Sequence, residues 1–251
     1  MSRLPRSSAI LALAIVLAVA GCGKPADQGA QQAQTPPAAP PNVPAHMADH
    51  FTKVREIEES IIRGDLEAAK APAQWIAEHQ ETGGVPAGTE RQIKEMKAAA
   101  ASVASANDVG TAAIAAASLV GACGSCHSAS KVAPKLPPVS EPAPGKDRKH
   151  HMMEHQVAID RMYRGLISPT SEDWRKGAEA LKAAPLGGKA MADISKEAVA
   201  AEARVHELAD RAIGAAEKSA RVTIYGSIIG ECASCHGLHG RVWGPGMPKA
   251  Q

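Results

Sequence analysis

Two stretches of the chain, Leu119–His127 (LVGACGSCH) and Ile228–His236 (IIGECASCH), share the pattern C-x-x-C-H behind an apolar run and a glycine. Two thiols three residues apart on one helical turn can add to the two vinyl groups of a porphyrin, and the following histidine can coordinate its iron. The pattern therefore predicts two covalently bound haem c groups. Their thioether bonds would form at Cys123, Cys126, Cys232 and Cys235, and their iron ligands would be His127 and His236.

Other chemistries that use paired cysteines fit this pattern less well. A structural zinc site needs two C-x-x-C pairs acting together, or histidines at ligand spacing. The two pairs here are 109 residues apart, and each has a histidine directly after it. A thioredoxin-like pair would lie near a βαβ pattern, and no strand pattern surrounds either motif.

The fifth cysteine, Cys22, follows a segment typical of export. Residues 1–21 combine a positive start, at Arg3 and Arg6, with a short apolar run, and end in the small residues AVAG. Such a run is too short to span a bilayer as a mature helix. The segment resembles a bacterial lipoprotein signal, which implies lipidation of Cys22. Gly23 stands where an aspartate commonly signals inner-membrane retention, so an outer-membrane location is favoured. The alternative is an ordinary signal peptide that leaves one spare thiol.

Charge does not suggest a nucleic-acid partner. The chain has 28 Lys and Arg against 26 Asp and Glu, and removal of Arg3 and Arg6 with the signal would leave 26 against 26. A balanced exported protein has no basic surplus for phosphate binding.

The composition divides the mature chain into two similar units. Residues 22–45 comprise the lipidated cysteine and a tether rich in Pro, Gln and Ala that cannot build a core. One unit follows at 46–131, a Pro-rich linker at 132–147, and a second unit at 148–240, before a tail at 241–251. The starts of the units are offset by 105 residues and their C-x-x-C-H motifs by 109. Each unit is small for a stable domain, and a porphyrin would fill its core.

Periodicity and capping signals predict an all-α protein. In the first unit, helices are expected at 46–63, 65–80, 89–106 and 108–128. In the second, they are expected at 148–167, 169–184, 189–213 and 217–237. Asp65 is a predicted N-cap, and Thr89 with Gln92 forms a predicted capping box. Four helices with short connections favour an up-down-up-down bundle, so the fold class is two tandem four-helix bundles.

This topology places the start of the first helix beside the end of the fourth. The first helix of each unit starts with H-M-x-x-H or H-M-M-x-H, at His46 and at His151. His50 and His155 lie on the apolar seam of that helix, one turn after Met47 and Met152. Position along the helix favours His50 and His155 as sixth iron ligands, with Met47 and Met152 as alternatives. Met247 is a weak alternative ligand for the second haem. Four further histidines are interpreted as surface residues: His79, His150, His206 and His239.

A C-x-x-C-H at the end of the last helix of a four-helix bundle resembles the class II c-type cytochromes, the cytochrome c-prime group. The resemblance covers residues 46–128 and 150–238. It implies a sixth site that is either open or filled by a first-helix methionine, for which Met47 and Met152 match by position. This chain departs from that pattern by adding His50 and His155.

These features together predict a lipid-anchored di-haem cytochrome that carries electrons among periplasmic redox proteins. No catalytic residue is predicted. The leading alternative is a gas-binding or haem-sensing protein with an open iron site. A di-haem peroxidase ranks third, because no long insertion or added acid–base pair lies near a motif.

Overall fold

The described helices form an all-α fold, as the periodicity predicts. The structure is a computed structural model that describes residues 42–79, 85–143, 145–168, 171–183 and 194–239. Its eight helices are α1 (Val43–Ile62), α2 (Leu66–Glu78), α3 (Glu90–Ala104), α4 (Val109–Ser130), α5 (Arg148–Ile167), α6 (Glu172–Ala183), α7 (Lys196–Ile213) and α8 (Lys218–His239). Each of the eight predicted segments contains a helix. Their ends differ by at most three residues, except that α7 begins at Lys196, seven residues after its predicted start at 189, and residues 189–193 lie outside the described part of the chain.

The helix starts show which capping predictions hold. The Asp65 side chain accepts a hydrogen bond from the Ala68 amide at 3.0 Å, so the predicted cap of α2 is confirmed. The capping box at Thr89 is wrong, although α3 does begin there. The Thr89 hydroxyl instead donates to the Pro86 carbonyl at 2.6 Å and caps nothing in the helix. The Thr89 hydroxyl therefore bonds to the preceding loop and not to the helix amides that the capping box predicts.

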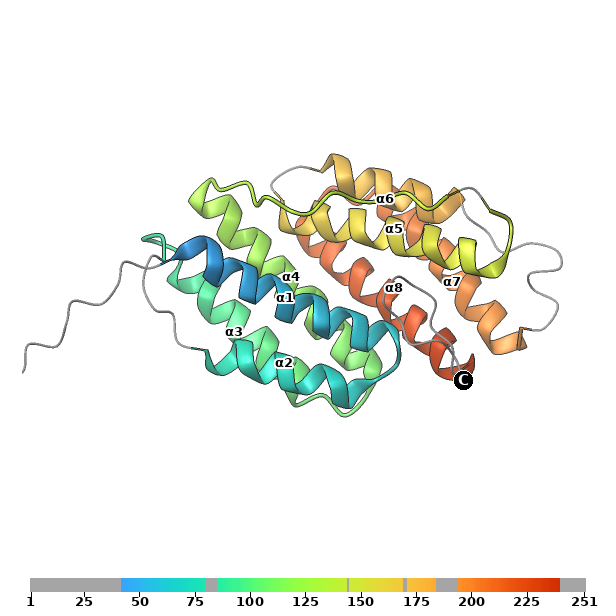
Figure 1. The fold of residues 1–251 in the computed structure, drawn as a ribbon, viewed down its shortest axis with the longest axis horizontal. Coiled ribbons are helices and arrows are strands. Elements are labelled where there is room, and N and C mark those ends of the chain that lie inside the picture. The colour runs from blue at the N-terminus through green and yellow to red at the C-terminus, as the bar shows by residue number, and fades with distance from the viewer. Residues whose placement is uncertain (1–41, 80–84, 144, 169–170, 184–193, 240–251) are drawn as a thin grey trace, which may run out of the picture. The chain divides into compact units, whose positions relative to one another are not determined.

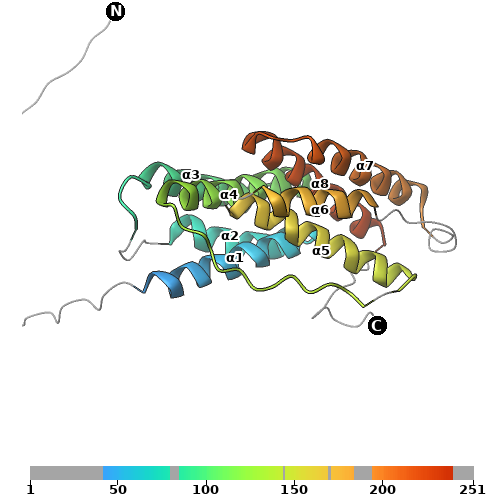
Figure 2. The same cartoon turned by 90° about the horizontal axis from the view of Figure 1, so that it is seen from above.

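Consecutive helices pack side by side in each half of the chain (Figures 1 and 2). In the first half, α1–α4, the last helix also contacts the first, and the same holds in the second half, α5–α8. The halves meet mainly through α4 and α8, and further contacts join α1 to α8 and α4 to α5. The described helices belong to one compact unit, with one hydrophobic core that draws on both halves.

Small residues allow α4 and α8 to approach closely. A Cβ atom at Gly226 of α8 would lie 2.9 Å from the Ile114 Cα atom and 3.1 Å from the Ala117 Cβ atom of α4. A contact that close involves the partner's backbone, which cannot rotate away as a side chain can. The absence of a side chain at Gly226 is therefore a condition for this helix crossing.

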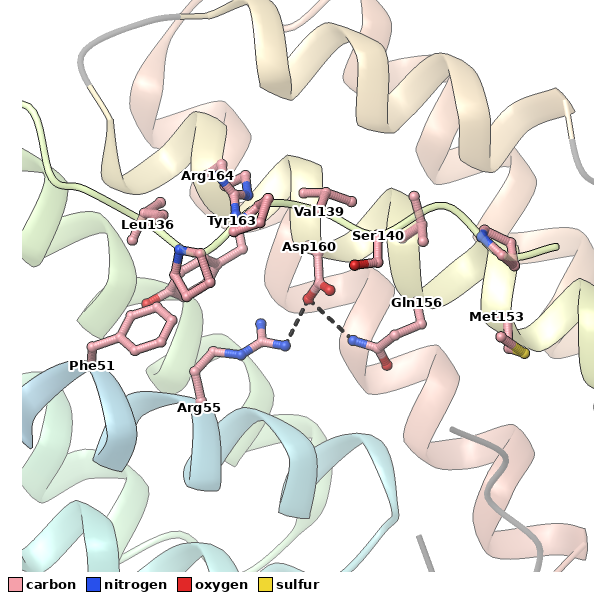
Figure 3. A pocket seen from close by; sticks show the side chains of 14 residues that line it. Phe51, Arg55, Leu136, Val139, Ser140, Met153, Gln156, Asp160, Tyr163 and Arg164 are labelled. Atoms are coloured by element: carbon pink, nitrogen blue, oxygen red, sulfur yellow. Dashed lines mark hydrogen bonds and ion pairs between the residues drawn. The ribbon is translucent and has the colours of Figure 1, made fainter. Parts of the chain in front are cut away.

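The Pro-rich linker packs against the helices, which the composition does not predict. Leu136 contacts the hydrophobic core, and Glu141 forms an ion pair with Arg161 of α5. Together with α1 and α5, the linker lines a cavity of about 300 Å³ (Figure 3). The linker can pack in this way because leucine and valine lie between its prolines.

One described helix, α4, is long and apolar enough to cross a membrane by length and composition alone. More than half of that apolar stretch is buried among the other helices, as in the core helix of a globular fold. The predicted signal peptide and Cys22 fall within residues 1–41, and Met247 within 240–251. Both segments lie outside the described residues.

Candidate functional site

Each C-x-x-C-H motif occupies the last turns of its helix, α4 or α8. In the first motif, Cys126 lies three residues after Cys123 and His127 four residues after it, so one side of the helix carries all three side chains. The four motif cysteines and both motif histidines are partly exposed. A large planar group could therefore reach the sulfur atoms from the surface of the fold.

Three of the four motif thiols, those of Cys123, Cys232 and Cys235, have a raised pKa and so are held in their neutral form. Burial, with a smaller contribution from Cys126, raises the pKa of Cys123 to about 12. Burial and then the Glu202 carboxylate raise the pKa of Cys232 to about 12, and they also raise the pKa of Cys235. Reactive dithiols in redox enzymes have a lowered pKa, because the thiolate is the nucleophile. The local environment therefore gives no support for a thiol–disulfide function.

Both motif histidines are oriented by backbone carbonyls. The Nδ1 atom of His127 lies 3.0 Å from the carbonyl oxygen of Ile167, and the Nδ1 atom of His236 lies 2.7 Å from that of Ile62. A carbonyl only accepts hydrogen bonds, so each Nδ1 must carry the proton. In that tautomer Nε2 is the nitrogen that offers a lone pair to a metal, which is the usual arrangement of metal-binding histidines.

These observations fit a covalently bound haem at each motif. Two partly exposed thiols on one helical turn could serve as attachment points, and a histidine oriented with Nε2 available to a metal follows them. Neither of two described cavities, one beside Leu136 and one beside Trp174, is lined by a motif residue. The fit thus rests on the donor set and its orientation.

In the second half, three imidazoles surround one carboxylate. Oε1 of Glu202, on α7, lies 3.0 Å from Nε2 of His151, 3.0 Å from Nε2 of His206 and 3.6 Å from Nε2 of His155. Burial by itself raises the pKa of Glu202, but hydrogen bonds from His151 and His206 and the charge of His155 bring it well below its usual range. The same carboxylate is close enough to raise the pKa of Cys232. The first-helix histidines and the second motif therefore share one region.

The first half has a related cluster built from histidines. The ring centroids of His46 and His50 are 4.3 Å apart, and Nε2 of His79, at the end of α2, lies 3.3 Å from Nδ1 of His46. Trp75 stacks on His79 with centroids 4.1 Å apart and meets the edge of His50. Three imidazole nitrogens of this cluster lie within 4.8 Å of one another, as do the ligand atoms of His151, His155 and Glu202. Either group could hold a metal ion.

Burial separates the two kinds of predicted sixth ligand. His50 and His155 are 6% and 7% exposed, whereas Met47 is 39% exposed. Met152 is half-buried. This difference agrees with the order that position along the helix suggests, because a buried imidazole is held inside the fold whereas Met47 faces solvent.

Three histidines interpreted as surface residues are not free surface residues. His79 and His206 belong to the two clusters, and His150 is half-buried beside Glu154 at 3.0 Å. All three side chains are partly exposed, so they lie at the surface as interpreted, but each has a partner on a neighbouring turn or helix. Glu202 was not identified from sequence. Its spacing of four from His206 was the available signal, since that spacing puts both on one helix face.

The chain was also compared with protein-family models, with curated proteins and with solved structures, and none of these comparisons found a match.

Proposed function

We propose that this chain is a di-haem c-type cytochrome, built from two tandem four-helix bundles, that carries electrons on the periplasmic side of a bacterial membrane. Haem c would be attached at Cys123 and Cys126 and at Cys232 and Cys235, with axial ligands His127 and His236. A lipid on Cys22 would anchor it, in the outer membrane by preference. Its partners would be periplasmic redox proteins, as expected of an electron carrier without a catalytic residue.

The observation that carries this proposal is the matched state of the two motif histidines. Each follows a C-x-x-C pair at the end of a helix, and each has its Nδ1 proton held by a carbonyl. One such histidine could be coincidental. Two in equivalent places support the proposal that both are axial ligands. When bound, haem supplies a one-electron couple, while the chain orients the imidazole and sets the polarity around it.

His50 and His155 are the proposed sixth ligands, which would make both irons six-coordinate and low-spin. The alternative function, gas binding or haem sensing at an open iron site, is favoured by one observation. His155 already has the Glu202 carboxylate within 3.6 Å, and His50 lies against His46. Imidazoles held in this way could stay off the iron. An optical spectrum with and without carbon monoxide separates the two functions.

Covalent attachment is tested directly by mass spectrometry of the denatured, full-length protein made in a host that matures c-type cytochromes. The wild type should retain two haems after acid–acetone extraction. Cys126→Ala should keep one stoichiometric haem, at the second motif, and Cys235→Ala one at the first. Ser125→Ala, a change inside the first motif that spares both thiols, should keep two. Extractable haem in the wild type would overturn the proposal.

A further inference from the structure

The two motif histidines reach across the molecule to the opposite half. His127 belongs to α4, but its acceptor is the carbonyl of Ile167, the last residue of α5. His236 belongs to α8, and its acceptor is the carbonyl of Ile62, the last residue of α1. Each hydrogen bond therefore joins the final helix of one half to the first helix of the other.

The two hydrogen bonds join equivalent residues: if the first half is superposed on the second, each bond falls on the other. The two histidines are 109 residues apart and the two acceptors 105 apart, which are the offsets of the motifs and of the first helices. The contacts between α4 and α8 are paired in the same way. A Cβ atom at Gly121 would approach Val222, and one at Gly230 would approach Ala113. The interface is therefore self-complementary, like that of a two-fold symmetric dimer.

A carbonyl at the end of a helix is a suitable acceptor for an axial histidine. The last four carbonyls of a helix have no intrahelical partner, and the helix dipole places partial negative charge there. A hydrogen bond to such an oxygen keeps the proton on Nδ1 and makes Nε2 a stronger donor to a metal. A stronger axial donor stabilises ferric over ferrous iron and lowers the reduction potential of the haem.

We propose that each half positions the axial histidine of the other half, so that the reduction potential of each haem is set across the interface between the halves. Ile62 and Ile167 act through their backbone carbonyls and are positioning residues. The inference rests on the proposed haem attachment. It predicts that a displacement of α5 from α4 alters the first haem without altering the second.

Gly124 offers a way to make that displacement. A Cβ atom at this position would lie 1.9 Å from the carbonyl oxygen of Leu166 and 3.0 Å from its carbonyl carbon, next to the Ile167 acceptor. Alanine there must push the end of α5 away from α4. The equivalent residue in the second motif is Ala233, so Gly124→Ala makes the first motif identical to the second, C-A-S-C-H. Haem attachment should therefore survive the change.

The test is a spectroelectrochemical titration of the full-length holoprotein. Gly124→Ala should raise the potential of the first haem and leave that of the second unchanged. The control, Gly237→Ala, adds a methyl group directly after the second motif, where nothing lies within 4 Å, and should leave both potentials unchanged. Equal shifts of both haems with Gly124→Ala, or no shift in either, would overturn the proposal.

A second measurement covers the case in which Gly124→Ala does not fold. In the wild type, the Nδ1 protons of His127 and His236 should give resolved NMR signals that exchange slowly with D₂O. Exchange as fast as in free histidine would contradict the proposal. If the wild type carries no haem, the proposed function fails. ¹⁵N shifts of the same two histidines would then still decide whether each has its proton on Nδ1, so the two failures are distinguishable.

Discussion

Arg55 and Asp160, which lie 105 residues apart at the same position in the first helix of each half, form an ion pair of 2.6 Å across the interface (Figure 3). The Arg55 guanidinium also pairs with Glu58 at 2.6 Å, and Glu58 in turn accepts a hydrogen bond from the Tyr225 hydroxyl of α8. The guanidinium stands over the ring of Tyr163, 5.2 Å from its centroid. Burial lowers the pKa of Arg55, but the two carboxylates more than offset this and raise it, so Arg55 stays charged. The halves are thus joined by a partly buried polar network as well as by apolar contacts.

The network should make stability depend on pH through Glu58. Burial raises the pKa of Glu58 above the ordinary 4.5, although Arg55 opposes the shift. Above pH 4.5 the folded state therefore binds more protons than the unfolded state, and stability falls as pH rises toward the folded pKa. Glu58→Gln should lack this fall, so its stability relative to the wild type should increase between pH 4.5 and pH 8. Urea unfolding followed by circular dichroism at several pH values measures the effect.

The matched control for this prediction is Glu56→Gln. Glu56 is an exposed carboxylate on the same helix that pairs with Lys53, so its removal should shift the stability curve little at any pH. Parallel curves for the wild type and Glu58→Gln would show that Glu58 does not carry the pH dependence.

Removal of His50 should change the coordination of the first haem. His50→Ala should turn it from low-spin to high-spin and open it to carbon monoxide, because the buried imidazole is the proposed sixth ligand. Met47→Ala is the matched control, one turn earlier on the same helix at an exposed position, and it should leave the optical spectrum nearly unchanged. The reverse pattern would identify Met47 as the sixth ligand, as the resemblance to class II cytochromes implies.

Membrane attachment should depend on Cys22 alone. Cys22→Ser should release a soluble periplasmic protein that still carries both haems, since neither the signal peptide nor the tether is expected to contribute to the haem-binding units. Fractionation of cells followed by haem staining checks both results. If the variant remained with the membranes, the lipid anchor would be ruled out.

The close crossing of α4 and α8 should not tolerate a side chain at Gly226. Gly226→Ala forces a methyl group against the backbone of Ile114 and should destabilise the fold by about 1–3 kcal/mol. Gly237→Ala, on the same helix but facing open space, should change stability little. The free energies of unfolding from denaturant titrations compare the two. Equal stability of the two variants would mean that the helices adjust without cost.

Local sequence signals predicted the helices well because they depend on neighbouring residues. The apolar seam of α1 and the Asp65 cap each act within a few residues, and all helices except α7 begin close to the predicted positions. The capping box at Thr89 failed for the same kind of reason. Two local partners competed for one hydroxyl, and the pattern named the wrong one.

The two histidine clusters could be predicted only in part. Helical periodicity placed His50 and His155 on the buried seam, and both are buried. It assigned no role to His79 or Glu202, because these come from other helices and their place depends on how the helices pack. The packing of the linker could not be predicted from its Pro-rich composition, because it depends on how Leu136 meets the helices in the folded chain.

The sequence by itself determined the all-α class, the positions of the helices and the four cysteines and two histidines that predict haem attachment. Only the tertiary structure decided which groups surround those histidines. The contacts from His127 to Ile167, from His236 to Ile62 and from Arg55 to Asp160 span 40, 174 and 105 residues. No local propensity acts over such separations. They exist because small residues let α4 and α8 cross closely, and that crossing brings the end of each first helix against the opposite motif.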